Sequence, residues 1–325
     1  MSFWDGKRVL VGGGCGFLGS YLVPELLDAG AEVLVVDDLS NGTEEFLPLD
    51  HPSIEFRRGD LSHQDVAEHA TADQDVVLNL AARAYGMEYS RSHNGEMLVS
   101  NLLCTLMPLD AARRNGVDHF LIMSSSCVYP DDALAPTPEL DVFTGLPEGV
   151  NEGYGWAKRI QELAGSYYAA DFGMNVTIVR PFNPYGANYR WGSEEKAHVV
   201  PALVKRVMDG EDPLVVWGSG DQQRNFLHAK DAARLLMLIV AAGPGPTPIN
   251  IGYEDTVTIR ELVELICEVA GRDPQIVFDT GKPEGRFKKS ADSTRLETVS
   301  DGYVPQISLK EGIVEMMEWY GRTFC

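Results

Sequence analysis

Short runs of apolar residues alternate with longer amphipathic segments through the first half of the chain. The runs occupy residues 7–11, 32–36, 54–58, 76–80, 120–123 and 176–180. Segments of helical period lie between several of them, most clearly at residues 20–29 and 151–170. Strands that alternate with helices predict a parallel sheet covered by helices on both faces. The pattern therefore indicates an α/β fold of the doubly wound type.

Beyond residue 180 the periodic segments become fewer. They predict two helices, one strand and a Pro/Gly linker, at residues 199–208, 231–240, 214–217 and 243–248 respectively. We expect a main domain over residues 1–180, with segments around 221–251 returning to it. A smaller C-terminal α/β domain is expected over residues 181–325.

A glycine-rich turn joins the first predicted strand to the first predicted helix. Gly14, Gly16 and Gly19 match G-x-G-x-x-G, and Gly13 with the last two matches the related G-x-x-G-x-x-G spacing. Glycines here permit a tight turn and let backbone N–H groups approach a diphosphate at the helix N-terminus. We therefore predict a Rossmann-like dinucleotide site, with cofactor contacts from Gly13, Cys15, Gly16, Phe17 and Leu18.

Acidic residues at the strand ends indicate the form of the cofactor. Asp37 and Asp38 end the second strand, where a carboxylate reaches the ribose hydroxyls of an adenosine. The carboxylate of Asp37 would repel the 2′-phosphate of NADP, and no Arg stands beside it in the sequence, so the predicted cofactor is NAD. Asp60 could contact the cofactor or serve as a helix N-cap. The other contacts expected at strand ends are Leu61, Ala81 and Ala82.

Charge and cysteine usage exclude several classes of function. The chain has 48 acidic and 27 basic residues, and its net charge of -21 argues against nucleic acid or an anionic membrane as a partner. No apolar run reaches the roughly 18 residues of a membrane span, and the N-terminal residues lack a signal-peptide core, so we expect a cytoplasmic protein. The 5 cysteines form no C-x-x-C pair, which favours free thiols over disulfides or a metal site.

A tyrosine and a lysine lie four residues apart in the helix predicted at residues 151–170. This spacing places Tyr154 and Lys158 on one helix face, where both can contact the cofactor. The ammonium of Lys158 would lower the pKa of Tyr154 and make the phenol a general base for an alcohol.

Together with the glycine turn, this Y-x-x-x-K resembles the extended short-chain dehydrogenases/reductases that modify nucleotide sugars, over nearly the whole chain. The resemblance implies that Ser125, in an S-x-x-x-Y segment ending at Tyr129, assists Tyr154 and Lys158. It also implies a nucleotide-diphosphate sugar as substrate and a homodimer. Asn101 corresponds to the central helix Asn of the family, and Asn79 replaces a more usual His.

Cys127 distinguishes branches of this family. Dehydratases carry an acid pair where Ser126 and Cys127 stand, and simple 4-epimerases carry small inert residues. The segment Ser-Cys-Val-Tyr-Pro is similar to GDP-mannose 3,5-epimerase and to GDP-L-fucose synthase, in which the Cys is an epimerisation acid/base. The resemblance implies Lys196, as in the first branch, or His198, as in the second, as its partner. Alternatively, Cys127 is a small buried hydrophobe, and Lys196 and His198 are a solvated charge and a helix start.

The resemblance also implies the substrate contacts, which are Gly86, Met87, Ser126, Asn183, Lys196, Arg224 and Arg286. A guanidinium suits a nucleotide phosphate. A local positive patch within the acidic chain would consist of Arg224, Arg286, Lys288 and Arg190, although surface charge is the alternative reading. Residues 131–150 are rich in Pro, Gly and acidic groups, and we expect a mobile insertion over the site.

These features predict an NAD-dependent nucleotide-sugar epimerase acting on a GDP-mannose-like substrate. C4 would be oxidised transiently, C5 or C3 or both epimerised, and C4 reduced again. The alternatives are an epimerase/4-reductase of the GDP-L-fucose synthase kind, a simple 4-epimerase, and a cofactor-binding sensor or scaffold without turnover. The intact Ser125, Tyr154 and Lys158 count against the last alternative.

Overall fold

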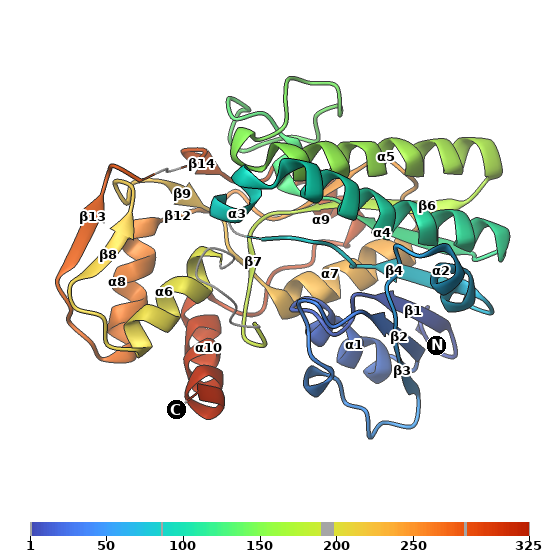
Figure 1. Ribbon diagram of the computed structural model, residues 1–325, viewed down its shortest axis with the longest axis horizontal. Helices are drawn as coiled ribbons and strands as arrows, with labels where there is room; N and C mark the ends of the chain where they lie inside the picture. Colours follow the sequence, from blue (N-terminus) through green and yellow to red (C-terminus); the bar gives the residue numbers. More distant parts are fainter. Residues whose placement is uncertain (1, 86, 190–197, 283–284, 325) are drawn as a thin grey trace.

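The computed structural model describes residues 2–85, 87–189, 198–282 and 285–324. Its main sheet has seven strands in the order β11-β6-β5-β4-β1-β2-β3, all parallel (Figure 1). The strands are β1 (Arg8–Gly12), β2 (Glu32–Asp37), β3 (Ile54–Arg58), β4 (Val76–Asn79), β5 (His119–Met123), β6 (Asn175–Pro181) and β11 (Ile249–Ile251). The expected doubly wound α/β fold is confirmed.

Each face of this sheet is covered by its own layer of helices. Val9 and Val11 of β1 pack toward α1 (Gly19–Asp28) and α7 (Ala229–Ala242), whereas Leu10 packs toward α2 (Gln64–Thr71), α4 (Asn94–Arg114) and α5 (Glu152–Phe172). Successive side chains of a strand point to opposite faces, so a strand buried on both faces must be apolar throughout. This explains the uninterrupted apolar runs of the sequence.

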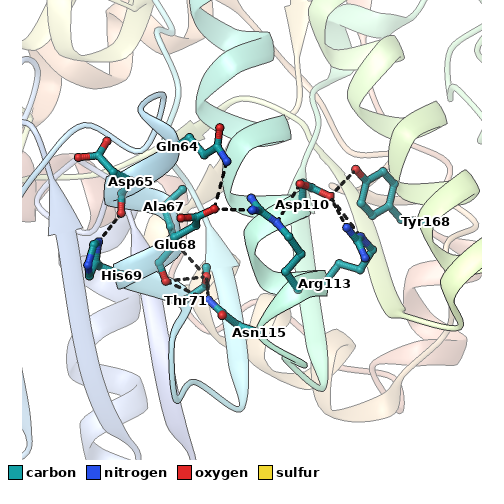
Figure 2. A network of polar contacts seen from close by, with 11 residues as sticks. Gln64, Asp65, Ala67, Glu68, His69, Thr71, Asp110, Arg113, Asn115 and Tyr168 are labelled. Atoms are coloured by element: carbon teal, nitrogen blue, oxygen red, sulfur yellow. Dashed lines mark hydrogen bonds and ion pairs between the residues drawn. The ribbon is translucent and has the colours of Figure 1, made fainter.

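The three helices of the second layer are also joined by polar contacts near their ends (Figure 2). Arg114 pairs with both Glu68 of α2 and Asp110 of its own helix. The Tyr168 hydroxyl of α5 donates to Asp110 Oδ1 at 3.2 Å. Such partly exposed pairs contribute little individually, so the apolar contacts below them supply most of the packing energy.

The C-terminal part has a separate apolar core. It forms between α6 (Val199–Met208), β8 (Leu214–Trp217), α8 (Ile259–Ala270), β13 (Ile276–Asp279) and α10 (Leu309–Phe324). Short strands connect it to the main sheet's carboxyl edge, namely β7 (Pro184–Tyr185), β9 (Gln223–Arg224), β10 (Leu227–His228), β12 (Val257–Thr258) and β14 (Lys288–Lys289). The remaining helices are α3 (Met87–Ser92) and α9 (Thr294–Val299). In the described residues, no helix combines the length and apolarity needed to cross a membrane.

The chain returns to the main sheet after the first strands of the C-terminal part. Residues 229–242 form α7 on the α1 face, and β11 pairs with β6 at the sheet edge. Predicted elements differ from those observed by one or two residues at their ends, as frayed termini do. The division into domains at residue 180 stays a prediction.

The insertion at residues 131–150 is held along its length rather than loose. Arg286 Nη2 donates to Ala133 O at 2.6 Å and to Thr137 Oγ1 at 2.8 Å. Arg180 Nη1 donates to Leu140 O at 2.8 Å, and Arg159 donates to backbone oxygens farther along. Buried guanidinium groups that bind backbone carbonyls oppose movement, so the expectation of a mobile insertion is wrong.

Candidate active site

The turn after β1 requires glycine for steric reasons. Gly13 has φ +73°, and a Cβ there would lie 2.8 Å from the backbone of Ala81. A Cβ on Gly19 would lie 2.4 Å from Gly14 O. Helix α1 begins at Gly19, and none of the described side chains caps its N-terminus. The turn therefore fits the diphosphate of a dinucleotide, which favours the positive end of a helix dipole.

Asp37 lies beside this turn at the end of β2. Its carboxylate accepts Cys15 N at 3.0 Å and Leu39 N at 2.8 Å, and its side chain is nearly buried, with 8% exposed. Burial raises the pKa of Asp37, while the two N–H donors lower it. The expected acidic group is therefore in position to meet an adenosine ribose.

An arginine does accompany the acidic pair, contrary to the expectation from the sequence. Arg83 Nη2 donates to Asp38 Oδ2 at 2.7 Å from a loop that lies 45 residues away. The argument against NADP from a missing Arg is therefore wrong. The repulsion between the Asp37 carboxylate and a 2′-phosphate still holds.

The other residues expected at the cofactor flank the same turn. Asp60 Oδ1 accepts Ser62 N at 2.8 Å, and α2 begins later at Gln64, so Asp60 closes a turn and is not the helix N-cap. Leu61 is buried against Gly12, and Ala81 contacts Gly13. Ala82 follows in the loop after β4. The structure thus places these residues beside the glycine turn.

Ser125, Tyr154 and Lys158 meet at the carboxyl end of β5. The Ser125 side chain lies close enough to the Tyr154 hydroxyl to lower its pKa. Lys158 Nζ lies 5.4 Å from the centroid of the Tyr154 ring and donates to Met123 O at 2.7 Å. The i,i+4 spacing on α5 and the Ser-containing turn after β5 thus bring the three predicted groups together.

Burial shifts the pKa of both the Tyr154 phenol and the Lys158 ammonium. Lys158 is 1% exposed, and its pKa is lowered to about 8. The pKa of Tyr154 is raised by burial and by the neighbouring Cys127 thiol, although Ser125 lowers it. The expectation that Lys158 lowers the pKa of Tyr154 is therefore wrong for the protein without bound cofactor.

Further polar residues hold the Lys158 side chain in place through hydrogen bonds. Lys158 Nζ donates to Gln161 Oε1 at 3.1 Å, and Gln161 Nε2 donates to Asn101 O at 2.6 Å. The Asn101 side chain accepts a hydrogen bond from Arg83 N at 3.0 Å and donates one to Arg83 O at 3.1 Å. This chain of hydrogen bonds connects Lys158 to the loop that carries Arg83.

Cys127 lies among charged residues that the sequence reasoning did not select. Glu148 N donates to Cys127 O at 3.1 Å, and the charge of Glu148 acts on the thiol. Lys289 of β14 forms an ion pair with Glu148. Burial raises the pKa of Cys127 to about 12, and the Glu148 charge contributes to this rise. The charge of Lys289 acts in the opposite direction.

Of the two predicted partners of Cys127, only His198 can be located. It is the N-cap residue of α6, and the protein around the imidazole lowers its pKa, as does the charge of Lys289. Lys196 lies outside the described residues. The choice between the two partners stays open.

The predicted substrate residues are only partly brought together. Asn183 Nδ2 donates to Asn225 O at 2.9 Å, and Ser126 is buried. Arg286 holds the insertion, as described above. Arg224 Nη1 donates to Gln223 O at 2.8 Å, and burial lowers the pKa of this arginine to about 10. The residues outside the described part, or without a described side chain, are Gly86, Met87 and Arg190.

Three charged residues of the site were missed from the sequence. Glu148 lies at the end of the Pro/Gly-rich insertion, Lys289 in a basic run, and Arg83 in a loop after β4. Each residue is distant in sequence from its partner, so no local motif indicates the contact. The available signal was a charged residue next to an apolar segment that is expected to be buried.

Comparison with known proteins agrees with this geometry. Residues 9–252 match the model of the NAD dependent epimerase/dehydratase family. GDP-L-fucose synthase 1 of Arabidopsis thaliana is 30% identical, over 98% of this chain and 94% of that protein. An epimerase structure from Methanothermobacter thermautotrophicus aligns with TM-score 0.90 and 28% identity, over 99% of this chain and 94% of the other.

A structure solved with cofactor is also similar. The complex of Thermus thermophilus UDP-glucose 4-epimerase with NAD aligns with TM-score 0.81 and 26% identity, over 98% of this chain and 100% of the other. The chain therefore belongs to the NAD dependent epimerase/dehydratase family of enzymes, and its cofactor is NAD.

Proposed function

We propose that the protein is a nucleotide-sugar epimerase that inverts C5, or both C3 and C5, of a GDP-mannose-like substrate. The observation that carries this proposal is the position of Cys127, two residues from Ser125 and close enough to Tyr154 to raise its pKa. A hydride-transfer group and a carbon acid/base thus share one site. An enzyme that only exchanged a hydride at C4 would not need the second group.

The chain's own residues would divide the reaction between them. Bound NAD supplies the hydride acceptor for C4 and later returns the hydride. Tyr154 would take the proton of the C4 hydroxyl. Ser125 would hydrogen-bond to that hydroxyl oxygen, and Lys158 would stabilise the phenolate. The ketone at C4 acidifies its neighbouring carbons, and Cys127 and a residue opposite would exchange protons there.

A direct experiment is to incubate the protein with GDP-mannose in heavy water and follow the sugar by NMR. The expected result is deuterium at C5, with or without C3, and no net change in nicotinamide absorbance. Cys127→Ala should abolish the deuterium while leaving the C4 oxidation intact. No deuterium in GDP-mannose or in other nucleotide sugars would contradict the proposal.

The second candidate is an epimerase/4-reductase, which the similarity to GDP-L-fucose synthases favours. Arg83 beside Asp38 also supplies a cation near the adenosine end. Such an enzyme would consume added NADH or NADPH in proportion to a 4-keto GDP-sugar. A steady fall in nicotinamide absorbance with that substrate would favour this candidate over the redox-neutral epimerase.

The third candidate is a simple 4-epimerase, as the UDP-glucose 4-epimerase neighbour is named. In that case the Cys127 thiol has no part in the reaction. Cys127→Ala would then keep nearly full activity, and product would form with UDP-sugars and without deuterium at C5.

A further inference from the structure

Gln161 is a buried glutamine that joins the Lys158 ammonium to the neighbouring helix. It lies three residues after Lys158 on α5, a spacing that places both side chains on one helix face. Lys158 Nζ donates to Gln161 Oε1 at 3.1 Å, and Gln161 Nε2 donates to Asn101 O of α4 at 2.6 Å. Gln161 and Asn101 are both 0% exposed. The amide thus bridges a buried cation and a buried backbone carbonyl.

The chemistry of the two neighbours determines which end of the amide faces which. An ammonium has only donors and a backbone carbonyl only accepts, so the amide oxygen faces Lys158 and the amide nitrogen faces Asn101. An apolar side chain of the same size would make neither hydrogen bond. Packing between α4 and α5 therefore does not by itself account for a glutamine at this position.

The surroundings of the Lys158 ammonium give it little help from opposite charges. The titratable groups that face it are Glu162 and the Tyr154 ring on α5, Cys104 on α4, and Cys127 after β5. The Glu162 carboxylate accepts from Arg180 at 2.8 and 2.6 Å. Burial raises the pKa of both thiols, so neither is charged at neutral pH. The hydrogen bonds to Met123 O and Gln161 Oε1 therefore replace the water that this cation loses on burial.

We propose that Gln161 is a positioning residue for hydride transfer, which holds the Lys158 ammonium beside the Tyr154 phenol and anchors it to α4. Two of the three N–H donors of Lys158 are directed to Met123 O and Gln161 Oε1, so the ammonium has a set orientation. The amide oxygen also favours the charged lysine, which is the form that stabilises the Tyr154 phenolate. The inference rests on the hydride-transfer step of the proposed function, which its three candidates share, and does not depend on Cys127.

The first test measures the charge of Lys158 and needs no substrate. The protein, labelled with ¹³C at the lysine Cε atoms and loaded with NAD, is titrated with base and followed by NMR. The Lys158 signal is the one that is absent from Lys158→Arg. Gln161→Met keeps the size of the side chain but removes the acceptor, so the titration midpoint of Lys158 should fall by about one unit or more. An unchanged midpoint would overturn the proposal.

Two further variants separate the acceptor from helix packing. Gln161→Glu keeps an oxygen at the same place and should leave the midpoint unchanged or raise it. Tyr168→Phe removes a different hydrogen bond between α5 and α4, which the Tyr168 hydroxyl donates to Asp110, and should titrate as the wild type does. A fall in either variant equal to that in Gln161→Met would assign the shift to packing and overturn the proposal. If Gln161→Met does not fold, a lowered midpoint in Gln161→Glu contradicts the proposal by itself.

The second test follows C4 oxidation through the nicotinamide absorbance at pH 6 and pH 8. A shift of one unit from a pKa of about 8 reduces the charged fraction of Lys158 at pH 8 from about one half to about one tenth. Gln161→Met should therefore react about fivefold slower there at saturating substrate, with little change in KM. At pH 6 nearly all of this lysine is charged in both proteins, so the loss should be smaller. An equal loss at both pH values would indicate a distorted site and contradict the proposal.

Failure of the proposed function and failure of this inference give different results. A wild type that oxidises C4 of no nucleotide sugar would refute the proposed function, while the lysine titration would still decide the role of Gln161. Conversely, C4 oxidation with the same pH dependence in the wild type and in Gln161→Met would leave the proposed function intact and refute the role of Gln161.

Discussion

At the scale of single residues, Lys158 carries a charge that depends on pH within the working range. Its ammonium is buried and bonded to a carbonyl and an amide, and the largest influence on its pKa is the loss of water. The neighbouring Glu162 opposes this effect but does not cancel it. The hydride-transfer step should therefore respond to pH through a lysine rather than through the tyrosine alone.

We predict that C4 oxidation slows as the pH rises above about 8, because Lys158 then loses the charge that stabilises the Tyr154 phenolate. The measurement is the rate of nicotinamide absorbance change on mixing with substrate over a pH series. In Lys158→Arg the guanidinium stays charged, so the remaining activity should not fall in this range. A wild-type rate that is constant up to pH 10 would contradict the assignment, since about 99% of Lys158 would then be neutral.

At the scale of elements, β5 and β6 are linked by a buried histidine that has no role in the site. His119 Nε2 lies 2.8 Å from Thr177 Oγ1 across the strand pair. Burial lowers the pKa of His119 from 6.5 to about 4. Protonation below neutral pH therefore favours the unfolded chain, in which this imidazole is hydrated.

The direction in which stability changes with pH follows from the number of protons that each state binds. Between pH 6.5 and about 4 the unfolded state binds more protons at His119 than the folded state, so stability is lost as the pH falls. We expect a loss of about 2 kcal/mol between pH 7 and pH 5 from this residue. Urea unfolding should show this loss in the wild type and in exposed His69→Gln, but not in His119→Gln. An equal loss in all three proteins would assign the pH dependence to other groups.

A buried ion pair also ties the sheet to α5. Arg180 of β6 donates to both oxygens of Glu162, at 2.8 and 2.6 Å, and both side chains are almost fully buried. The Arg180 guanidinium also binds the insertion and the Tyr129 hydroxyl. Removing one partner would leave an uncompensated buried charge, so this pair connects the stability of α5 to the position of the insertion.

At the scale of the whole molecule, α4 and α5 lie side by side (Figure 1). Both helices carry exposed apolar side chains. On α4 these are Val99 and Leu103, spaced i,i+4, and on α5 they are Ile160 and Tyr167, spaced i,i+7. Such spacing places each pair on one helix face. We infer that this two-helix face is covered by a second copy of the chain, which would form the homodimer expected from the sequence.

The oligomeric state tests this inference. Analytical ultracentrifugation should give a dimer for the wild type, and Val99→Glu with Tyr167→Glu should give a monomer with unchanged secondary structure. Leu238→Glu changes an exposed leucine on α7, on the other side of the sheet, and should remain a dimer. A wild-type monomer at micromolar concentration, or a dimer that survives both glutamates, would contradict it.

The sequence by itself determined the parallel sheet and the elements that carry the candidate site. These depend on local signals: apolar runs for buried strands, glycines where a Cβ would clash, and a fixed i,i+4 spacing on one helix. Asp37, Tyr154 and Lys158 are recognisable for this reason, whereas Ser125 was predicted through the resemblance to the family.

Only the tertiary structure decided the surroundings of Cys127 and the charge states of the site. Glu148 and Lys289 meet that thiol from an insertion and a short strand far along the chain, and Arg83 reaches Asp38 in the same way. Acidity depends on burial and on the total of neighbouring charges, which no local pattern contains. For this reason the sequence singled out Cys127, while its burial and its charged neighbours follow from the fold.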